Sequence, residues 1–302
     1  MTVTLRQLAI FEKVALYGSV TKAGEGLLIS QSGVSMALAE LERLSGGELF
    51  ARSGRRLYLN ERGRLLLPEV QEILQRATRL EQALQESADD PAGILLVGAS
   101  TTIGNYLLPV LFGRFARRYR RAKVVLQVGN TQQISAELLA GRLDIGLIEG
   151  PCHTKGLICD PWRDDELVVI APPGHPWSKR GRATPAMLAA APWIMRERGS
   201  GTREVFEGAM ARLGSAYQIA LELGHTEAIK KAVEGGLGVS CLSRLAVGRE
   251  LEQGWLKEIH TPLNLGRELL LLTRQERRQT PLYLAFLALL KDPDGFAKGG
   301  RT

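Results

Sequence analysis

The sequence predicts a protein of several domains, with an N-terminal all-α winged helix-turn-helix, a long linker helix and a C-terminal α/β domain. Three observations predict this division. Apolar residues recur every three or four positions near the N-terminus, a heptad pattern follows, and beyond residue 93 short apolar runs alternate with helical stretches. The 302 residues, 45% of them hydrophobic, are enough for two sizeable cores. We therefore place the domains at residues 1–63, 64–90 and 91–302.

Three short helices are expected at the N-terminus. From Leu5 onward the apolar residues share one helical face, Ser19 or Thr21 caps a second helix that ends near Leu27, and Ser30 caps a third. The third helix has an apolar back at Val34, Leu38, Leu41 and Leu44. The residues that point elsewhere, Gln31, Ser32, Ser35, Met36 and Glu40, give it a front that is mostly polar near its N-terminus. This pattern is typical of a helix-turn-helix whose front enters the major groove of DNA, and a small structural bundle is the alternative.

A basic hairpin is predicted after the third helix. Residues 49–59 alternate as in a hairpin and carry three arginines at the turn, Arg52, Arg55 and Arg56. Such a hairpin is typical of a wing beside a helix-turn-helix, and a solvated basic loop is the alternative.

The linker helix carries an apolar seam. Apolar residues follow one another at intervals of four, three, four, three and four, at Leu66, Val70, Ile73, Ala77, Leu80 and Leu84. One helix cannot bury such a seam alone, so we expect it to pair with a second copy of the chain; packing on its own chain is the alternative. Turn-forming residues at 87–93 end this segment.

The C-terminal part alternates strands and helices. Strands are expected at 94–97, 124–128, 144–148, 167–171, 193–195, 219–223, 239–242 and 269–273, and helices follow Thr102, Gln132, Thr202 and Thr226. The continuous apolar strands predict mostly parallel sheets covered on both faces.

Two loops rich in hydroxyl groups are expected to form one ligand cleft. Ligands of open α/β sheets bind beyond the carboxyl ends of the strands, where hydroxyls and backbone N–H groups at helix starts can hold a small anion. The expected residues are Ser100, Thr101 and Thr102 in one loop, Ser200, Thr202 and Arg203 in the other, and Glu149, His225 and Thr226 at equivalent strand ends. Each loop alone is better explained as a helix cap, and only the two together indicate the walls of one cleft. Glu149 would repel an anion unless Arg203 or His225 balances it, so the charge of the ligand stays open.

The sequence offers no catalytic constellation. It has no nucleophile elbow, phosphate-binding loop, zinc-protease motif or Cys-x-x-Cys pair, so we expect no enzyme, no metal and no cofactor. The spacing of Cys152 and Cys159 matches no common zinc site; a redox disulfide and two unrelated thiols are the alternatives. Three cysteines, the lack of a secretory leader and the lack of an apolar span predict a cytoplasmic protein without a membrane partner.

These features together resemble the LysR-type transcriptional regulators over about residues 5 to 290. The motifs that carry the resemblance include Leu5-Arg-Gln-Leu8, Gly18-Ser19, Ser30-Gln31-Ser32, Leu49-Phe50-Ala-Arg52, Leu59-Asn60-Glu-Arg-Gly63, Leu143-Asp144-Ile-Gly-Leu and Gly174-His-Pro176. The segment 98–106 resembles the corresponding segment of the subgroup that controls carbon fixation and sulfur assimilation, whose effectors are often small anions or phosphorylated metabolites. The chain departs from the family at Ser32, Met36, Gly24 and Gly26, which alters the surface that reads bases.

The resemblance implies a homodimer or homotetramer whose effector domain has two lobes and resembles periplasmic binding proteins. Lobe 1 would span about 91–163 and 266–302, and lobe 2 about 164–265. The effector cleft of the family maps onto Ser100, Thr101 and Thr102 in lobe 1, and onto Ser200, Thr202, His225 and Thr226 in lobe 2, with Glu149 nearby.

We therefore expect a regulator that binds double-stranded promoter DNA and a small-molecule effector. Gln31, Ser32, Ser35 and Met36 would face base edges, and Thr21, Ser30, Arg52, Arg55 and Arg56 would complete the DNA contact. Lobe closure would change the spacing of two DNA-binding heads. A thiol-redox-responsive regulator of the same fold and a solute-binding protein are the alternatives. Of the net charge of +7, the first ninety residues contribute −1, so bulk charge does not explain DNA binding.

Overall fold

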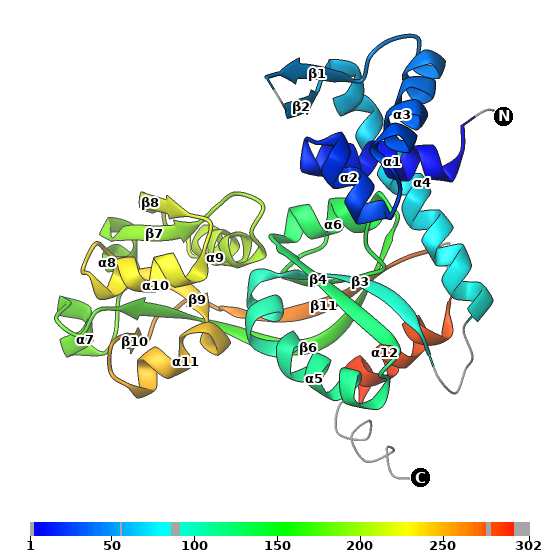
Figure 1. The fold of residues 1–302 in the computed structure, drawn as a ribbon. Coiled ribbons are helices and arrows are strands. Elements are labelled where there is room, and N and C mark those ends of the chain that lie inside the picture. Colours follow the sequence, from blue (N-terminus) through cyan, green and yellow to red (C-terminus); the bar gives the residue numbers. More distant parts are fainter. Residues whose placement is uncertain (1–2, 55, 86–90, 276–278, 293–302) are drawn as a thin grey trace. The chain divides into compact units, whose positions relative to one another are not determined.

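The computed structural model describes residues 3–54, 56–85, 91–275 and 279–292 of the chain (Figure 1). The chain divides into two compact units, Met1–Gln85 and Glu86–Thr302. The linker helix therefore belongs with the N-terminal unit. No helix in the described part is both long and apolar enough to cross a membrane.

The N-terminal unit contains the predicted helices and hairpin. Its elements are α1 (Leu5–Tyr17), α2 (Val20–Leu27), α3 (Gln31–Ser45), β1 (Phe50–Ser53), β2 (Arg56–Leu59) and α4 (Glu61–Gln85). Side chains cap the helix starts: Thr4 and Gln7 form a capping box on α1, Ser19 caps α2, and Ser30 caps α3. Of the two residues considered for the start of α2, Ser19 is thus the cap.

The apolar seam of α4 is divided between two environments, which corrects the prediction of one continuous dimer seam. Val70 is only 1% exposed and belongs to the core of its own unit with Phe11 and Val34, and Leu66 packs against the same core. Ile73 and Leu80 remain 45% and 58% exposed. The first turns of α4 therefore complete the N-terminal core, and only the later part of the seam is left for a second copy. The side chain of Leu84 lies outside the described residues.

The C-terminal unit is built on a seven-stranded sheet with β9 as a branch, in the order β10-β6-β11-β5-β3-β4. The strands of lobe 1 are β3 (Gly93–Ser100), β4 (Ala122–Gly129) and β5 (Ile145–Glu149), and β3 pairs in parallel with both of the others. The long strands β6 (Leu157–Ala171) and β11 (Gly266–Arg274) run antiparallel to each other, and β11 is antiparallel to β5. The prediction of mostly parallel sheets is therefore wrong: the sheet is mixed, because one long strand leads out of lobe 1 and the other returns to it.

Lobe 2 gathers around the far end of β6. There β6 pairs with β9 (Ser240–Ser243) and β10 (Lys257–Ile259), and a separate parallel pair is formed by β7 (Pro192–Arg196) and β8 (Gln218–Leu223). Five helices surround these strands: α7 (Pro176–Arg180), α8 (Pro185–Ala190), α9 (Gly201–Arg212), α10 (Thr226–Glu234) and α11 (Arg244–Glu252). The sequence did not predict α7, α8, α11, β10 or the first ten residues of β6.

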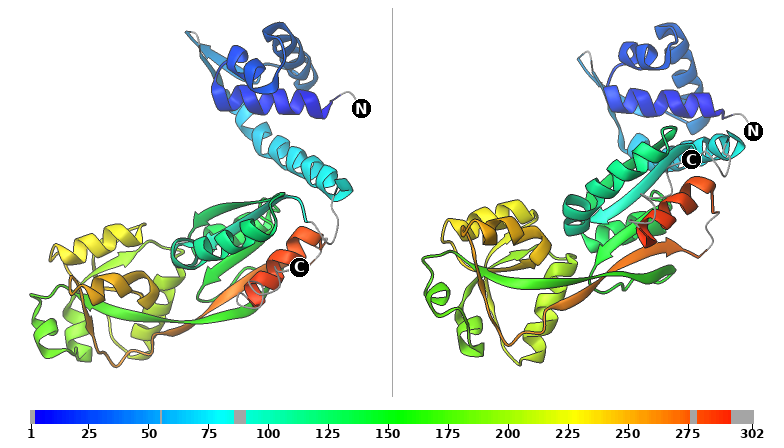
Figure 2. Two further views of the ribbon diagram at one scale, coloured as in Figure 1. Left: turned by 60° about the horizontal axis from the view of Figure 1, so that its bottom comes forward. Right: turned by 90° about the horizontal axis from the view of Figure 1, so that it is seen from below.

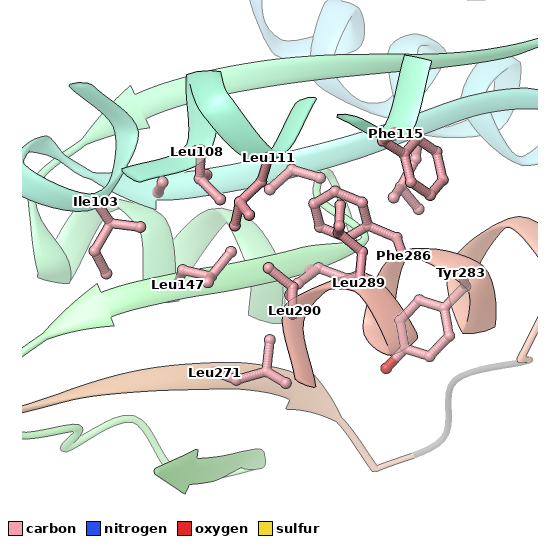
Figure 3. Packing of buried hydrophobic residues seen from close by; sticks show 14 of the residues in the cluster. Ile103, Leu108, Leu111, Phe115, Leu147, Leu271, Tyr283, Phe286, Leu289 and Leu290 are labelled. Atoms are coloured by element: carbon pink, nitrogen blue, oxygen red, sulfur yellow. The ribbon is translucent and has the colours of Figure 1, made fainter. Parts of the chain in front are cut away.

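Helices cover both faces of the lobe 1 sheet, as Figure 2 shows. The short π-helix η1 (Ile103–Leu107) continues into α5 (Leu108–Arg118), which packs with α12 (Pro281–Lys291) on one face, and α6 (Thr131–Leu139) covers the other. Figure 3 shows the core between α5, α12 and the strands, where Phe115 meets Phe286 edge to face. Each buried apolar cluster of this unit lies within one lobe: two draw only on residues between 95 and 148 and between 269 and 290, and two only on residues between 167 and 265.

Candidate functional site

The N-terminal unit presents the polar front of α3 to solvent. Gln31, Ser32, Ser35 and Met36 are exposed, whereas Val34, Leu38 and Leu41 of the same helix are buried. The hydroxyl of Ser30 accepts a hydrogen bond from the backbone N–H of Gly33 at 3.1 Å and lies 3.0 Å from the hydroxyl of Ser32. The predicted base-facing residues therefore share one accessible face, and Ser30 fixes the start of the helix that carries them.

The wing is a two-stranded hairpin that exposes two of its arginines. Arg52 pairs with Leu57 in the register and Ser53 with Arg56, and both arginine side chains are exposed. Arg55 lies outside the described residues. The backbone N–H of Leu57 donates to the carbonyl of Gly18 at 2.9 Å, which ties the hairpin to the end of α1. Thr21 is exposed on α2.

In the C-terminal unit the two predicted hydroxyl loops meet at the carboxylate of Glu149, at the end of β5. Thr102 donates to it twice, from its backbone N–H at 2.7 Å and from its hydroxyl at 2.9 Å, and Thr202 donates its hydroxyl from the other lobe at 2.9 Å. A side chain at Gly201 would collide with the carbonyl of Glu149, so only glycine lets α9 begin this close to β5. The two predicted loops therefore meet at one carboxylate, and an effector cleft between them stays a prediction.

The charge of Glu149 is balanced by Arg267, which the sequence did not single out. The guanidinium of Arg267 lies 2.8 Å from the Glu149 carboxylate and 2.7 Å from Asp165, and it also donates to the hydroxyl of Thr202. Burial alone would raise the pKa of Glu149, but Arg267 and the hydrogen bonds from Thr102 and Thr202 outweigh it and hold that pKa below its usual range. Glu149 is therefore a buried anion at neutral pH.

Arg203 and His225, the two residues named as possible partners of Glu149, do not contact its carboxylate. Arg203 instead donates to Glu207 at 2.7 Å and to Glu222 at 2.6 Å, while the side chain of His225 is exposed and makes no capping bond. With Ser200, Arg203 lines a pocket of about 630 Å³ to which Glu149 does not contribute. The balance that the sequence left open between Arg203 and His225 is thus provided by neither; Arg267 was missed because it lies more than a hundred residues from Glu149, on the returning strand β11.

Further hydrogen bonds join the lobes around Glu149. The guanidinium of Arg196 donates to the hydroxyl of Thr101 at 3.2 Å, and the phenol of Tyr106 donates to Glu227 at 2.6 Å. Burial and the bond to Glu227 raise the pKa of Tyr106 to about 12, so it remains a donor at neutral pH. The hydroxyl of Ser100 is buried without a hydrogen-bond partner, and Thr226 is buried at the start of α10. Two hydrogen bonds therefore join the lobes here, and Ser100 keeps a buried hydroxyl without a hydrogen-bond partner.

Two cysteines lie close together after β5: Cys152 in the β5–β6 connection and Cys159 in β6. Cys152 and Cys159 are both free and half-buried. Burial, and then the neighbouring thiol, raise the pKa of Cys159 to about 12, so this thiol is almost entirely protonated at neutral pH. Among the described residues, no three His, Cys, Asp or Glu side chains gather in a way that could hold a metal ion.

Each of the two units matches a known protein family. Residues 5–64 match the bacterial regulatory helix-turn-helix protein of the lysR family, and residues 88–293 match the LysR substrate binding domain. The HTH-type transcriptional regulator YeiE of Escherichia coli strain K12 is 47% identical over 263 residues, which cover 87% of this chain and 88% of that protein. A probable RuBisCO transcriptional regulator of Cyanidioschyzon merolae is 33% identical over 290 residues, 94% of this chain and 96% of that one. The solved regulatory domain of Synechocystis PCC6803 CcmR in complex with 2-PG matches with a TM-score of 0.62 and 29% identity, over 66% of this chain and 96% of that chain.

Proposed function

Because the chain belongs to the LysR family of DNA-binding transcriptional regulators, we propose that a small anion bound between its two lobes controls how it binds promoter DNA. The likeness to a regulator named for RuBisCO supports the carbon-fixation subgroup. The likeness to a CcmR regulatory domain in complex with 2-PG supports a small anionic effector. We place the protein in the cytoplasm, where its promoter DNA is.

The N-terminal unit is the DNA-binding head. The front of α3 carries hydrogen-bonding side chains at Gln31 and Ser35, which suit base edges in the major groove, while Arg52 and Arg56 of the wing suit phosphates. The exposed Ile73 and Leu80 of α4 provide an apolar surface for a second copy, which would bring two heads onto one operator.

The observation that carries the effector proposal is the set of donors around Glu149. A backbone N–H, two hydroxyls and a guanidinium converge on one buried point, the arrangement that holds an oxyanion in proteins. Glu149 now occupies that point with its own carboxylate. An anionic effector would take over these donors as the Glu149 side chain swings away, and the unused hydroxyl of Ser100 would add one more.

This exchange would also couple the cleft to the lobes. Thr102 belongs to lobe 1 and Thr202 to lobe 2, so any group between them sets the distance between the lobes. An effector that prefers one lobe spacing shifts the population toward that spacing, and a dimer can convert the shift into a different separation of its heads.

Calorimetry of the full-length chain with sulfate, phosphate and 2-PG tests this assignment. Thr102→Ala and Thr202→Ala are expected to weaken binding of whichever anion the wild type binds, by about tenfold each, because each removes a donor to a charged group. Thr184→Ala removes a hydroxyl of the same domain that caps α8, and it should leave anion affinity unchanged. Equal anion affinity in the wild type and both cleft variants would overturn the proposed site.

A further inference from the structure

The front of α3 has an apolar centre. Met36 is 74% exposed, the largest exposed apolar side chain on this helix. It is two residues from Val34 and two from Leu38, so at about 100° per residue it lies nearly opposite the buried back of the helix. Both of those residues are buried in the core, which fixes the rotation of the helix and keeps Met36 pointing outward.

Met36 has the longest unpaired side chain at the centre of that front, because the exposed residues beside it have short side chains. Ser32, Ser35 and Ala39 are also exposed and are small. Arg43, one turn beyond Ala39, is held by Glu40 through two hydrogen bonds of 2.8 and 2.7 Å. A surface that approaches this helix face therefore meets the methionine thioether before it meets a free charge.

The major groove of DNA offers only one prominent apolar group at its base edges, the C5-methyl of thymine. A methionine at the centre of a reading helix matches that group and matches no donor or acceptor of guanine, adenine or cytosine. We propose that Met36 reads a thymine methyl in each half-site of the operator. The inference rests on the proposed function in one respect, that the front of α3 enters the major groove.

Replacing single thymines by deoxyuridine tests this, because the replacement removes only the methyl group. The probe is a duplex selected in vitro for binding by the full-length chain, with each thymine replaced in turn. A replacement at the thymine that Met36 contacts should weaken wild-type binding about fourfold when it is made in one half-site, because one methyl group is no longer buried. The same replacement made in both half-sites should weaken binding about fifteenfold. In Met36→Ala the same replacement should have no effect.

Two control variants separate the possible failures. Leu16→Ala removes an exposed leucine of α1 in the same unit, so this variant should keep the wild-type deoxyuridine penalty. A penalty that persists in Met36→Ala, or no penalty at any thymine in the wild type, would overturn the assignment of Met36 while leaving the reading helix in place. If Gln31→Ala and Met36→Ala both bind the probe as tightly as the wild type, α3 is not the reading element, and the proposed DNA-binding head fails with it.

Discussion

Replacing Glu149 by glutamine tests whether a built-in carboxylate occupies an anion site. The carboxylate accepts three hydrogen bonds from Thr102 and Thr202, and Arg267 lies 2.8 Å away. Glutamine removes the charge and turns one acceptor into a donor, so one of the converging donors loses its partner. Breaking a buried ion pair costs about 3–5 kcal/mol. Because Arg267 keeps Asp165 at 2.7 Å, we expect the lower end, about 3 kcal/mol.

Denaturation followed by tryptophan fluorescence measures this loss directly in the full-length chain. All four tryptophans, Trp162, Trp177, Trp193 and Trp255, lie in the C-terminal unit, so the signal reports on the effector domain alone. A matched control is Glu137→Gln, which breaks a partly exposed pair with Arg142 and should cost less than about 1 kcal/mol.

The contribution of Glu149 to the stability of the effector domain should depend on pH. The pKa of Glu149 is held below its usual value, so its contribution to stability is complete above about pH 4.5 and is lost as the pH falls through the lowered pKa. The stability difference between the wild type and Glu149→Gln should therefore be constant near neutrality and shrink in acid.

Added anion should reverse the effect of the substitution. With the internal carboxylate gone, sulfate or phosphate can satisfy the freed donors, so either should stabilise Glu149→Gln more than it stabilises the wild type. A variant as stable as the wild type, or one that anions do not restore, would refute the view that Glu149 stands in an anion site.

Four further variants test the wing, the α4 surface and the two cysteines. Arg52→Ala and Arg56→Ala should each lower the slope of log affinity against log salt by about one, in filter-binding titrations; unchanged slopes would remove the wing from the interface. Leu80→Glu should weaken self-association in sedimentation without lowering stability, since the side chain is exposed, and an unaltered oligomer would contradict the role of α4. The Cys152→Ser, Cys159→Ser double variant should bind DNA like the wild type before and after peroxide, because the Cys159 thiol is protonated; a wild-type response to peroxide that the variant lacks would show redox control.

The sequence predicts those elements whose signals are local. Ser19 and Ser30 mark helix starts through bonds to residues three positions on, and the hydroxyl loops at Thr102 and Thr202 are recognisable because each follows an apolar strand. Local signals suffice there because the partners of each group lie within one turn or one strand end.

The remaining features depend on partners distant in the chain. The first part of β6 has no continuous apolar run, and it becomes a strand only through β11, a hundred residues later. Arg267 reaches Glu149 by the same return of the chain. The sequence position of Val70 suits a dimer seam as well as it suits the core of its own unit. Only the packing of Val70 in one cluster with Phe11 shows that it belongs to the core.

The most direct test of effector control is the affinity of the full-length chain for promoter duplex, measured over a range of sulfate, phosphate or 2-PG concentrations. Ionic strength is held constant with chloride, because salt alone weakens DNA binding. The account predicts that one of these anions changes the affinity or the length of the footprint, and that Glu149→Gln responds at a lower concentration of that anion. An anion that binds in calorimetry yet leaves DNA affinity and footprint unchanged in both proteins would contradict it.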